Sequence, residues 1–307
     1  MSIKIISSGL QTTIQDLGRE GWAHMGVPES GGADKLSLKL ANLLLNKALN
    51  SPVIECTLTG PTLRFLKPYS LVITGADMKP RINNKKIEMN TVLSVIPNDI
   101  LSLDNCSKGC RAYIALSEDI CSEKFLGSAS TYLPAKLGGI NGLALTDSTI
   151  IDTKPYKIET TPPLNIDFNI PCSFENEWKI RVIEGPEYNF VTNSSKEKIF
   201  SSIFSVSNDE NRMGCRLKGV DIKLTTHDQM VSCPMIQGTI QCPKNGSPII
   251  LGCDSQTLGG YPRILQIAAV DIHLIGQLRP NDSVSFERID LNQAREELKN
   301  KKSLFHS

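Results

Sequence analysis

Hydrophobic and polar residues alternate over short distances along most of this chain, which is typical of β-strands. The segments are three to five residues long and rich in β-branched side chains, and turn dipeptides such as Asn98-Asp99 and Asn245-Gly246 lie beside several of them. The clearest are residues 71–74, 93–96, 112–116, 180–183, 249–251 and 283–286. Many short strands with few helices between them predict a mainly β fold built from barrels or sandwiches.

Two segments carry a helical pattern instead. The first begins near Asp34, which is suited to cap its N-terminus, as is the turn at Ser30. Its apolar face consists of Leu36, Leu40, Leu43 and Leu44. The second runs over residues 290–301, begins with an aspartate and ends in lysines. Because these charges suit the helix dipole, it is predicted to be a surface helix.

The chain also contains three pairs of similar segments in the same order. Residues 30–40 resemble 207–217, an offset of 207 − 30 = 177, and the pair 72–77 and 249–254 has the same offset. Pro97-Asn98-Asp99 matches Pro280-Asn281-Asp282 at 280 − 97 = 183. The helix start near Asp34 is thereby aligned with residues 211–217, a shorter segment in which Gly214 indicates a turn.

A repeat of this length is much longer than the roughly 20–50 residues of a solenoid unit and indicates two copies of one domain. The region 152–171 between the copies is rich in proline, as linkers often are. We therefore predict two domains related by internal duplication, residues 1–160 and 161–307.

Composition narrows the classes of function. Of 307 residues, 40% are hydrophobic and 21% charged, which is a globular composition able to bury a core. The formal net charge of +1 argues against nucleic acid or an anionic membrane as a partner. No apolar run has the length of a membrane span, and the N-terminus lacks a signal-peptide pattern. We expect a cytoplasmic protein.

The nine cysteines are scattered and odd in number, so they are expected to be small buried hydrophobic residues in a reducing compartment. The closest pair, Cys106 and Cys110, has no second pair or histidine at metal-ligand spacing. No metal site is predicted. The four histidines are dispersed and suggest no catalytic grouping.

Two polar motifs in the first half are candidates for ligand binding. Residues 9–19 include Gln11, Thr12, Gln15 and Asp16, side chains suited to hydrogen-bonding a small polar solute. Asp16 and Arg19 are equally suited to pairing with each other and pinning a loop. Residues 26–34 form a glycine turn ahead of the helix, where free amides can hold an anion or simply make a turn and a cap. The segment lacks the Gly-Lys-Ser/Thr ending of a phosphate loop.

In the second half, Arg212 lies at the aligned position and is suited to a carboxylate or carbonyl ligand. Gln241 and the run Thr257-Leu258-Gly259-Gly260-Tyr261 add hydrogen-bonding groups and a double glycine, where a ligand can approach the backbone closely. The plainer alternatives are a surface arginine, and a hairpin turn followed by a core tyrosine.

These motifs, taken together and in this order, resemble one family. They include Gln11–Arg19, Leu58–Leu63, Thr74–Asp77, Gly109–Tyr113, Leu126–Thr131, Arg212–Leu217, Gly238–Pro243, Thr257–Pro262 and Gln277–Asp282. The chain is similar over nearly its whole length to the biotin-dependent carboxyltransferases, also called allophanate hydrolase subunit 2. Bacterial members of this family include the 5-oxoprolinase C component, the Kip inhibitor antagonist.

The resemblance implies two tandem cyclophilin-like β-barrel domains and three alternative functions. One is the C component of an ATP-dependent 5-oxoprolinase, a hydrolase that opens 5-oxoproline to glutamate together with an A component and a Kip-inhibitor-like B component. The second is a carboxyltransferase component that moves a carboxyl group from biotin to urea or another amide. The third is a regulatory antagonist that binds a Kip-inhibitor-like protein.

The chain contains neither a biotin-attachment sequence nor a phosphate loop. We therefore expect no cofactor attached to this chain, ATP to be used by the complex, and biotin to act in trans only in the carboxyltransferase alternative. The chain alone is expected to be inactive.

An amide or lactam substrate offers N–H donors and a carbonyl acceptor, and the motif residues satisfy both. We predict catalytic roles for Arg212, Asp16 and Tyr261. Predicted substrate-binding residues are Gln11, Thr12, Gln15, Ser30, Asp34, Gln241, Thr257, Gly259 and Gly260.

Overall fold

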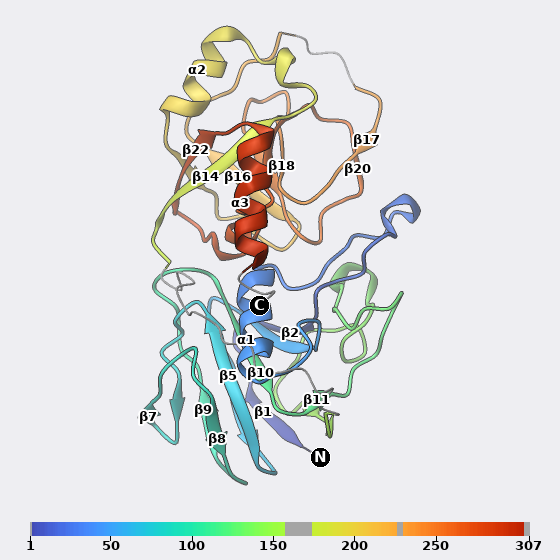
Figure 1. Ribbon diagram of the computed structural model, residues 1–307, viewed down its shortest axis with the longest axis vertical. Coiled ribbons are helices and arrows are strands. Elements are labelled where there is room, and N and C mark those ends of the chain that lie inside the picture. Colours follow the sequence, from blue (N-terminus) through green and yellow to red (C-terminus); the bar gives the residue numbers. More distant parts are fainter. Residues whose placement is uncertain (1, 157–173, 226–229, 304–307) are drawn as a thin grey trace. The chain divides into compact units, whose positions relative to one another are not determined.

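The computed structural model describes residues 2–156, 174–225 and 230–303, and the chain divides into two compact units (Figure 1). Unit 1 comprises Met1–Glu20 and Ser30–Phe174, and unit 2 comprises Gly21–Glu29 and Glu175–Ser307. The predicted boundary at residue 160 lies outside the described residues. The assignment of residues 21–29 to unit 2 was not foreseen from the sequence.

Unit 1 is built from two antiparallel sheets. The six-stranded sheet has the order β12-β1-β4-β9-β6-β7 and the five-stranded sheet the order β2-β3-β10-β5-β8. The strands of the first are β1 (Ile3–Ser7), β4 (Thr62–Phe65), β6 (Arg81–Ile82), β7 (Lys85–Lys86), β9 (Ile100–Ser102) and β12 (Ile150–Ile151). Those of the second are β2 (Gln11–Gln15), β3 (Val53–Thr57), β5 (Tyr69–Gly75), β8 (Leu93–Val95) and β10 (Arg111–Leu116). A small ribbon pairs β11 (Asp119–Ile120) with β13 (Thr153–Lys154), and η2 (Leu133–Ala135) is a single 3₁₀ turn.

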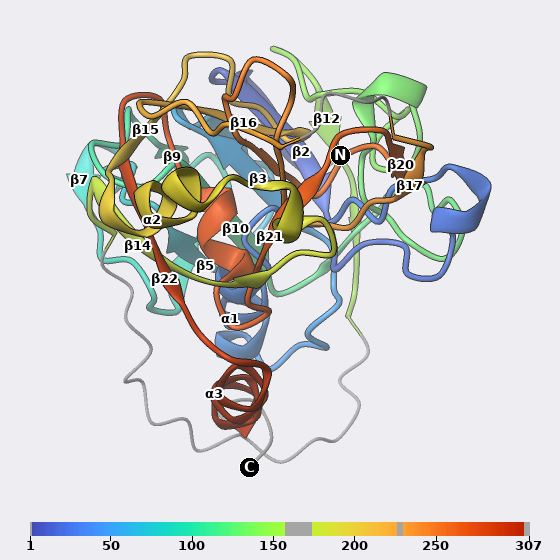
Figure 2. The ribbon, with the colours of Figure 1, turned by 90° about the horizontal axis from the view of Figure 1, so that it is seen from above.

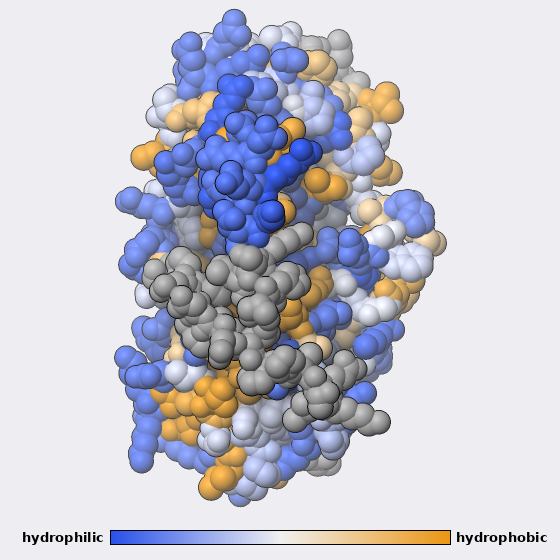
Figure 3. Space-filling model, in the orientation of Figure 1, coloured by the Kyte–Doolittle hydropathy of each residue, from blue (hydrophilic) through white to orange (hydrophobic). Residues whose placement is uncertain are grey.

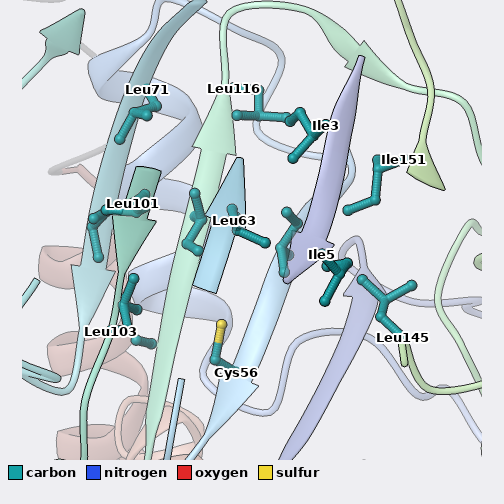
Figure 4. Packing of buried hydrophobic residues seen from close by; sticks show 14 of the residues in the cluster. Ile3, Ile5, Cys56, Leu63, Leu71, Leu101, Leu103, Leu116, Leu145 and Ile151 are labelled. Carbon is teal, nitrogen blue, oxygen red and sulfur yellow. The ribbon is translucent and has the colours of Figure 1, made fainter. Parts of the chain in front are cut away.

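The core of unit 1 lies between these sheets. Ile3 and Ile5 of β1 and Leu63 of β4 pack with Leu71 of β5 and Cys56 of β3, and all five are fully buried (Figure 4). Desolvation by burial, followed by the neighbouring charge of Glu55, raises the pKa of the Cys56 thiol far above its usual range. All eight cysteines in the described residues are free, and six of them are buried as predicted, whereas Cys121 is exposed and Cys233 is half-buried.

The opposite face of the five-stranded sheet carries α1 (Lys35–Leu44). Leu38 and Ala41 pack with Val72, Tyr113 and Ala115 in a second, smaller apolar cluster. The predicted cap is confirmed, because the Asp34 carboxylate accepts hydrogen bonds from the amides of residues 36 and 37, both at 3.0 Å. A cap of this kind contributes about 1 kcal/mol.

Unit 2 is a closed barrel of seven strands in the order β14-β21-β18-β19-β16-β15-β22. The barrel closes where β14 and β22 pair in parallel, and the other neighbours are antiparallel. Its strands are β14 (Glu177–Glu184), β15 (Phe204–Val206), β16 (Gly214–Lys218), β18 (Thr239–Gln241), β19 (Ile249–Leu251), β21 (Arg263–Ile267) and β22 (Ser283–Arg288). A short ribbon outside the barrel pairs β17 (Cys233–Pro234) with β20 (Leu258–Gly259). The mainly β prediction is therefore confirmed in both units.

Unit 2 also contains helical segments among its described residues. They are η1 (Ala23–Met25), η3 (Tyr188–Phe190), α2 (Asn193–Ser201), η4 (Ile272–Gln277) and α3 (Leu291–Ser303). Figure 2 looks down the axis of α3, which follows β22. The surface over α3 is almost wholly hydrophilic in Figure 3, so the predicted C-terminal surface helix is confirmed. Within the described residues, no helix is long and apolar enough to cross a membrane.

The sequence repeats differ in how well they match in space. Pro97–Asp99 and Pro280–Asp282 form the same turn, with φ of 74° at Asn98 and 71° at Asn281. Each asparagine N–H donates to the last carbonyl of a neighbouring strand, that of Phe65 in β4 (2.7 Å) and that of Val206 in β15 (2.9 Å). Residues 30–40 and 207–217 do not match in this way. The first leads into α1, whereas the second is a turn that continues into β16, so the turn indicated by Gly214 is confirmed and the helix is not repeated.

Candidate functional site

Polar side chains gather on the outer face of the five-stranded sheet beside the α1 cluster, to which Tyr113 also belongs. Strand register aligns Gln11 with Thr57 and Thr57 with Arg111, and it aligns Thr13 with Glu55 and Glu55 with Tyr113. These rows cross β2, β3 and β10 on one face, because side chains two residues apart on a strand point to the same side. Except for the half-buried Gln11, all of these residues are buried.

The same alternation separates Thr12 from the other predicted residues of β2. Thr12 pairs with Cys56 and lies on the core side, where its hydroxyl donates to the Ser8 carbonyl at 2.5 Å. Its neighbour Thr13 occupies the polar face together with Gln11 and Gln15. The grouping of Thr12 with the two glutamines is therefore a correction to the sequence-based prediction.

Two buried oxygen atoms at the C-terminal end of β2 make no hydrogen bond to the described residues: Gln15 Oε1 and Ser30 Oγ. Gln15 is fully buried and its amide nitrogen donates to Thr13 Oγ1 (3.0 Å) and to the Thr131 carbonyl (3.1 Å). Ser30 is also fully buried and adopts a φ of 56°, an uncommon conformation for a residue with a side chain. An unsatisfied buried polar atom costs about 1–3 kcal/mol, so both atoms are candidates for binding a ligand.

The carboxylate of Asp16 accepts four hydrogen bonds from its own unit. Oδ1 accepts from the amide of Gly18 (2.8 Å) and from the hydroxyls of Ser128 and Ser130 (both 2.6 Å), while Oδ2 accepts from the amide of Ala129 (2.7 Å). Asp16 thus fixes the segment around residues 128–130 against the end of β2. These contacts support a positioning role for Asp16 in place of the predicted catalytic one.

Two further residues of the first motifs also serve the fold. Arg19 is buried, and its guanidinium donates to the carbonyls of Ser130 and Phe125. The Asp34 carboxylate caps α1 and accepts the hydroxyl of Ser37 at 2.6 Å. Asp34 was predicted to bind substrate, but the structure commits its carboxylate to the helix.

In unit 2 the buried acceptor Gln241 Oε1 is also without a hydrogen-bond partner in the described residues and lies beside a glycine of the predicted double-glycine turn. Gln241 is 3% exposed, and a Cβ atom added to Gly259 would lie 3.6 Å from Oε1. On the next strand, Arg263 forms a bidentate pair with Glu187, with Nε–Oε2 and Nη2–Oε1 distances of 2.8 and 2.7 Å. This pairing lowers the pKa of Glu187.

Arg212 is held by a bidentate ion pair with Asp254. The distances are 2.7 Å from Nε to Oδ2 and 3.1 Å from Nη2 to Oδ1, and both residues are buried. The Asp254 amide in turn donates to the Arg212 carbonyl at 2.9 Å. The pair therefore joins the residues after β19 to the turn before β16. This contact gives Arg212 a structural role in addition to the predicted catalytic role.

The remaining predicted residues lie on or next to the β17–β20 ribbon. The Thr257 carbonyl accepts the Met235 amide at 2.8 Å, and a Cβ added to Gly260 would lie 3.4 Å from the Met230 carbonyl. Tyr261 is 46% exposed, so it is not a core residue. In residues 2–156, 174–225 and 230–303, no three His, Cys, Asp or Glu side chains form a possible metal site.

Sequence reasoning missed Thr13, Glu55, Arg111 and Tyr113. Glu55 and Tyr113 each lie within a largely apolar strand, where a buried charge or hydroxyl is uncommon unless it is paired. The Tyr113 hydroxyl donates to Glu55 Oε2 at 2.9 Å. Burial, followed by the negative charges of Glu55 and Asp34, raises the pKa of Tyr113 well above its usual value. A polar residue inside an apolar strand was the signal available in the sequence.

Residues 25–288 match the model of one protein family, described as the carboxyltransferase domain, subdomain A and B. The chain belongs to this family. It is 32% identical to the 5-oxoprolinase C component of Escherichia coli (strain K12), an alignment that covers 95% of this chain and 93% of that protein.

This carboxyltransferase-family chain is also similar to parts of larger enzymes. It is 31% identical to the urea amidolyase of Lachancea kluyveri over 96% of its own length but only 17% of that protein. In structure it matches the K. lactis urea amidolyase with a TM-score of 0.89 and 28% identity, over 99% of this chain and 20% of the other. The chain thus spans about a fifth of the urea amidolyases and nearly all of the 5-oxoprolinase component.

Proposed function

We propose that this chain is the C component of an ATP-dependent 5-oxoprolinase complex that opens 5-oxoproline to glutamate. The observation that carries the proposal is the end-to-end match to the Escherichia coli 5-oxoprolinase component, 95% of one chain against 93% of the other. The name of that relative implies other subunits, and we propose the A component and the Kip-inhibitor-like B component as partners.

The unsatisfied acceptors supply the chemistry of substrate binding. A lactam ring offers one N–H and one carbonyl. Gln15 Oε1 in unit 1 and Gln241 Oε1 in unit 2 are each buried acceptors suited to an N–H donor. The Ser30 hydroxyl can donate to a carbonyl or carboxylate. A site built to hydrogen-bond such groups rejects analogues that lack them, because its polar atoms would then remain unpaired.

The test is reconstitution with the partner proteins from the same genome. The complete complex is expected to hydrolyse ATP only when 5-oxoproline is present, and the chain alone is expected to be inactive. Omitting the chain should abolish glutamate formation. If the complex of all three proteins forms but produces no glutamate from 5-oxoproline, the proposal is wrong.

Gln241→Met tests the acceptor in unit 2, because methionine has a similar volume and no amide. It is expected to raise the KM for 5-oxoproline roughly tenfold, the effect of one lost hydrogen bond. Gln256→Met is the matched control, since Gln256 is an exposed glutamine in the same unit. An equal KM for the two variants would remove Gln241 from the substrate site.

A second candidate function is carboxyl transfer from biotin to urea or another amide. The TM-score of 0.89 to the K. lactis urea amidolyase over 99% of this chain favours it. In this case carboxybiotin would be supplied in trans on a carrier protein. Urea-dependent loss of the carboxyl group from a carboxylated carrier, measured with and without the chain, distinguishes this function from 5-oxoproline opening.

A further inference from the structure

Three consecutive backbone amides lay the segment Ser30–Asp34 across the polar face of unit 1. The Gly32 amide donates to the Asp16 carbonyl at the end of β2 (2.8 Å), and the Ala33 amide donates to Glu55 Oε2 on β3 (2.8 Å). The Asp34 amide donates to the Tyr113 hydroxyl on β10 (2.7 Å). Because β2, β3 and β10 are neighbours in the sheet, each step along the segment is fixed to the next strand.

The side chains beneath this segment form one hydrogen-bonded unit. The Tyr113 hydroxyl accepts from the segment and donates to Glu55 Oε2, which also accepts the Ala33 amide. Glu55 is 1% exposed, and the Arg111 guanidinium, with Nε 4.0 Å from Oε1, compensates its charge. A charged carboxylate in such a buried place is costly unless its hydrogen bonds are made, so this unit fixes the segment strongly.

The segment needs such fixing because its backbone is unusual. Ser30 and Gly31 have φ of 56° and 87°. A Cβ added at Gly31 would lie 2.7 Å from the Leu17 carbonyl carbon, so the segment touches the chain just after β2. Residues in sparsely populated conformations persist only where the surroundings hold them. The residue so held is Ser30, whose buried hydroxyl is one of the two unsatisfied groups at this end of β2.

We propose that Glu55 and Tyr113 are positioning residues that hold the Ser30 hydroxyl in place to bind the substrate carbonyl or carboxylate. The inference rests on the proposed function for the identity of the substrate. Neither residue touches the substrate; each acts through the backbone of residues 33 and 34. Arg111 supports them by compensating the charge of Glu55.

The test is a double-mutant cycle in the reconstituted complex. Tyr113→Phe removes the hydroxyl and keeps the ring that packs against Leu38 and Val72. Ser30→Gly removes the other hydroxyl with a residue that tolerates positive φ. Each single variant is expected to raise the KM for 5-oxoproline roughly tenfold and to leave the KM for ATP unchanged. The KM of the double variant for 5-oxoproline should be no higher than that of Ser30→Gly, since both changes remove the same interaction.

Tyr69→Phe is the matched control, because Tyr69 is a buried tyrosine of the same sheet whose hydroxyl contacts Thr153 Oγ1 at 2.8 Å, away from the segment. It is expected to leave the KM for 5-oxoproline unchanged. Additive effects of Tyr113→Phe and Ser30→Gly, or an equal rise in KM for Tyr69→Phe, would overturn the proposal.

Hydrogen exchange separates this inference from the proposed function. In Tyr113→Phe, the amides of residues 33 and 34 are expected to exchange at least roughly tenfold faster than in the wild type, whatever the substrate is. Unchanged exchange there contradicts the positioning role even if the complex is active. If exchange is faster in Tyr113→Phe but the wild-type complex does not open 5-oxoproline, the positioning role stands and only the proposed function is contradicted.

Discussion

Asp16 in unit 1 and Asp254 in unit 2 are buried carboxylates that lie shortly after a strand, but their hydrogen bonds are made in different ways. Asp16, directly after β2, accepts four hydrogen bonds from two serine hydroxyls and two backbone amides. Asp254, three residues after the end of β19, is held by the single guanidinium of Arg212. Asp16 and Asp254 are 2% and 3% exposed, so burial does not distinguish them.

This difference determines how strongly a single substitution destabilises each unit. Four neutral donors make hydrogen bonds to the Asp16 carboxylate, so the loss of one donor leaves three hydrogen bonds in place. Asp254 is paired with one cation, so removing Arg212 leaves the Asp254 carboxylate buried without that guanidinium. The Arg212–Asp254 ion pair is therefore expected to be more sensitive to a single substitution than the four-donor arrangement around Asp16.

The largest effect is expected for Arg212→Ala. Breaking a buried ion pair by removing one partner costs about 3–5 kcal/mol, so the free energy of unfolding of unit 2 should fall by that amount. Hydrogen exchange of the amides in β16 and β19 measures it. Arg288→Ala is the control, because Arg288 pairs with Glu184 at the surface, where a pair is worth about 0–1 kcal/mol.

The sequence-based hypothesis for Arg212 makes a different prediction. If Arg212 mainly stabilises an oxyanion, Arg212→Ala should lower turnover roughly a hundredfold with folding intact. A variant with wild-type exchange in unit 2 and this loss of turnover would restore the catalytic role and contradict the structural one.

Asp16→Ala is expected to have the second largest effect. It removes the acceptor for all four donors, but the segment 128–130 can move toward water, so we expect a loss of about 2–3 kcal/mol. The exchange of the Ala129 and Gly18 amides should report it directly. A loss of unfolding free energy as large as that of Arg212→Ala would show that the four-donor arrangement around Asp16 tolerates substitution no better than the ion pair.

Acid should weaken unit 2 through a second ion pair, Glu187–Arg263. The hydrogen bond and charge of Arg263 lower the pKa of Glu187 below its ordinary value of 4.5. The stabilisation is therefore fully present above pH 4.5 and is lost as the pH falls through the lower, folded-state pKa. In Glu187→Gln, the unfolding free energy of unit 2 should depend less on pH below this value. An unchanged slope would exclude this pair as a source of acid sensitivity.

The smallest effect is expected for Ser128→Ala. It removes one of four donors to Asp16, which should cost about 1 kcal/mol. Urea unfolding of unit 1 measures it, with Ser122→Ala as the control, because the Ser122 hydroxyl donates to the Ile120 carbonyl (3.4 Å). A cost near that of Asp16→Ala would mean that the four donors act as one cooperative group.

Local pattern predicted the elements well where the decisive interactions are local. The α1 helix and its Asp34 cap follow from side chains within four residues of one another. The Pro-Asn-Asp turns match in both units because the left-handed asparagine is set by the turn itself. Gly214 indicated the turn at residues 211–217, but the strand that begins there depends on pairing with β19, a contact that lies outside the local sequence.

The sequence alone determined which side chains in β2 are polar and therefore that Gln11 and Gln15 belong to a hydrogen-bonding surface. Its strand period already implied that Thr13, and not Thr12, shares their face. Tertiary structure alone brought Glu55 and Tyr113 beneath residues 33 and 34, because these residues are distant in the chain and meet only through sheet register and the crossing of Ser30–Asp34. It also decided which polar atoms have partners, since a hydrogen bond depends on the distance between two atoms and not on residue type.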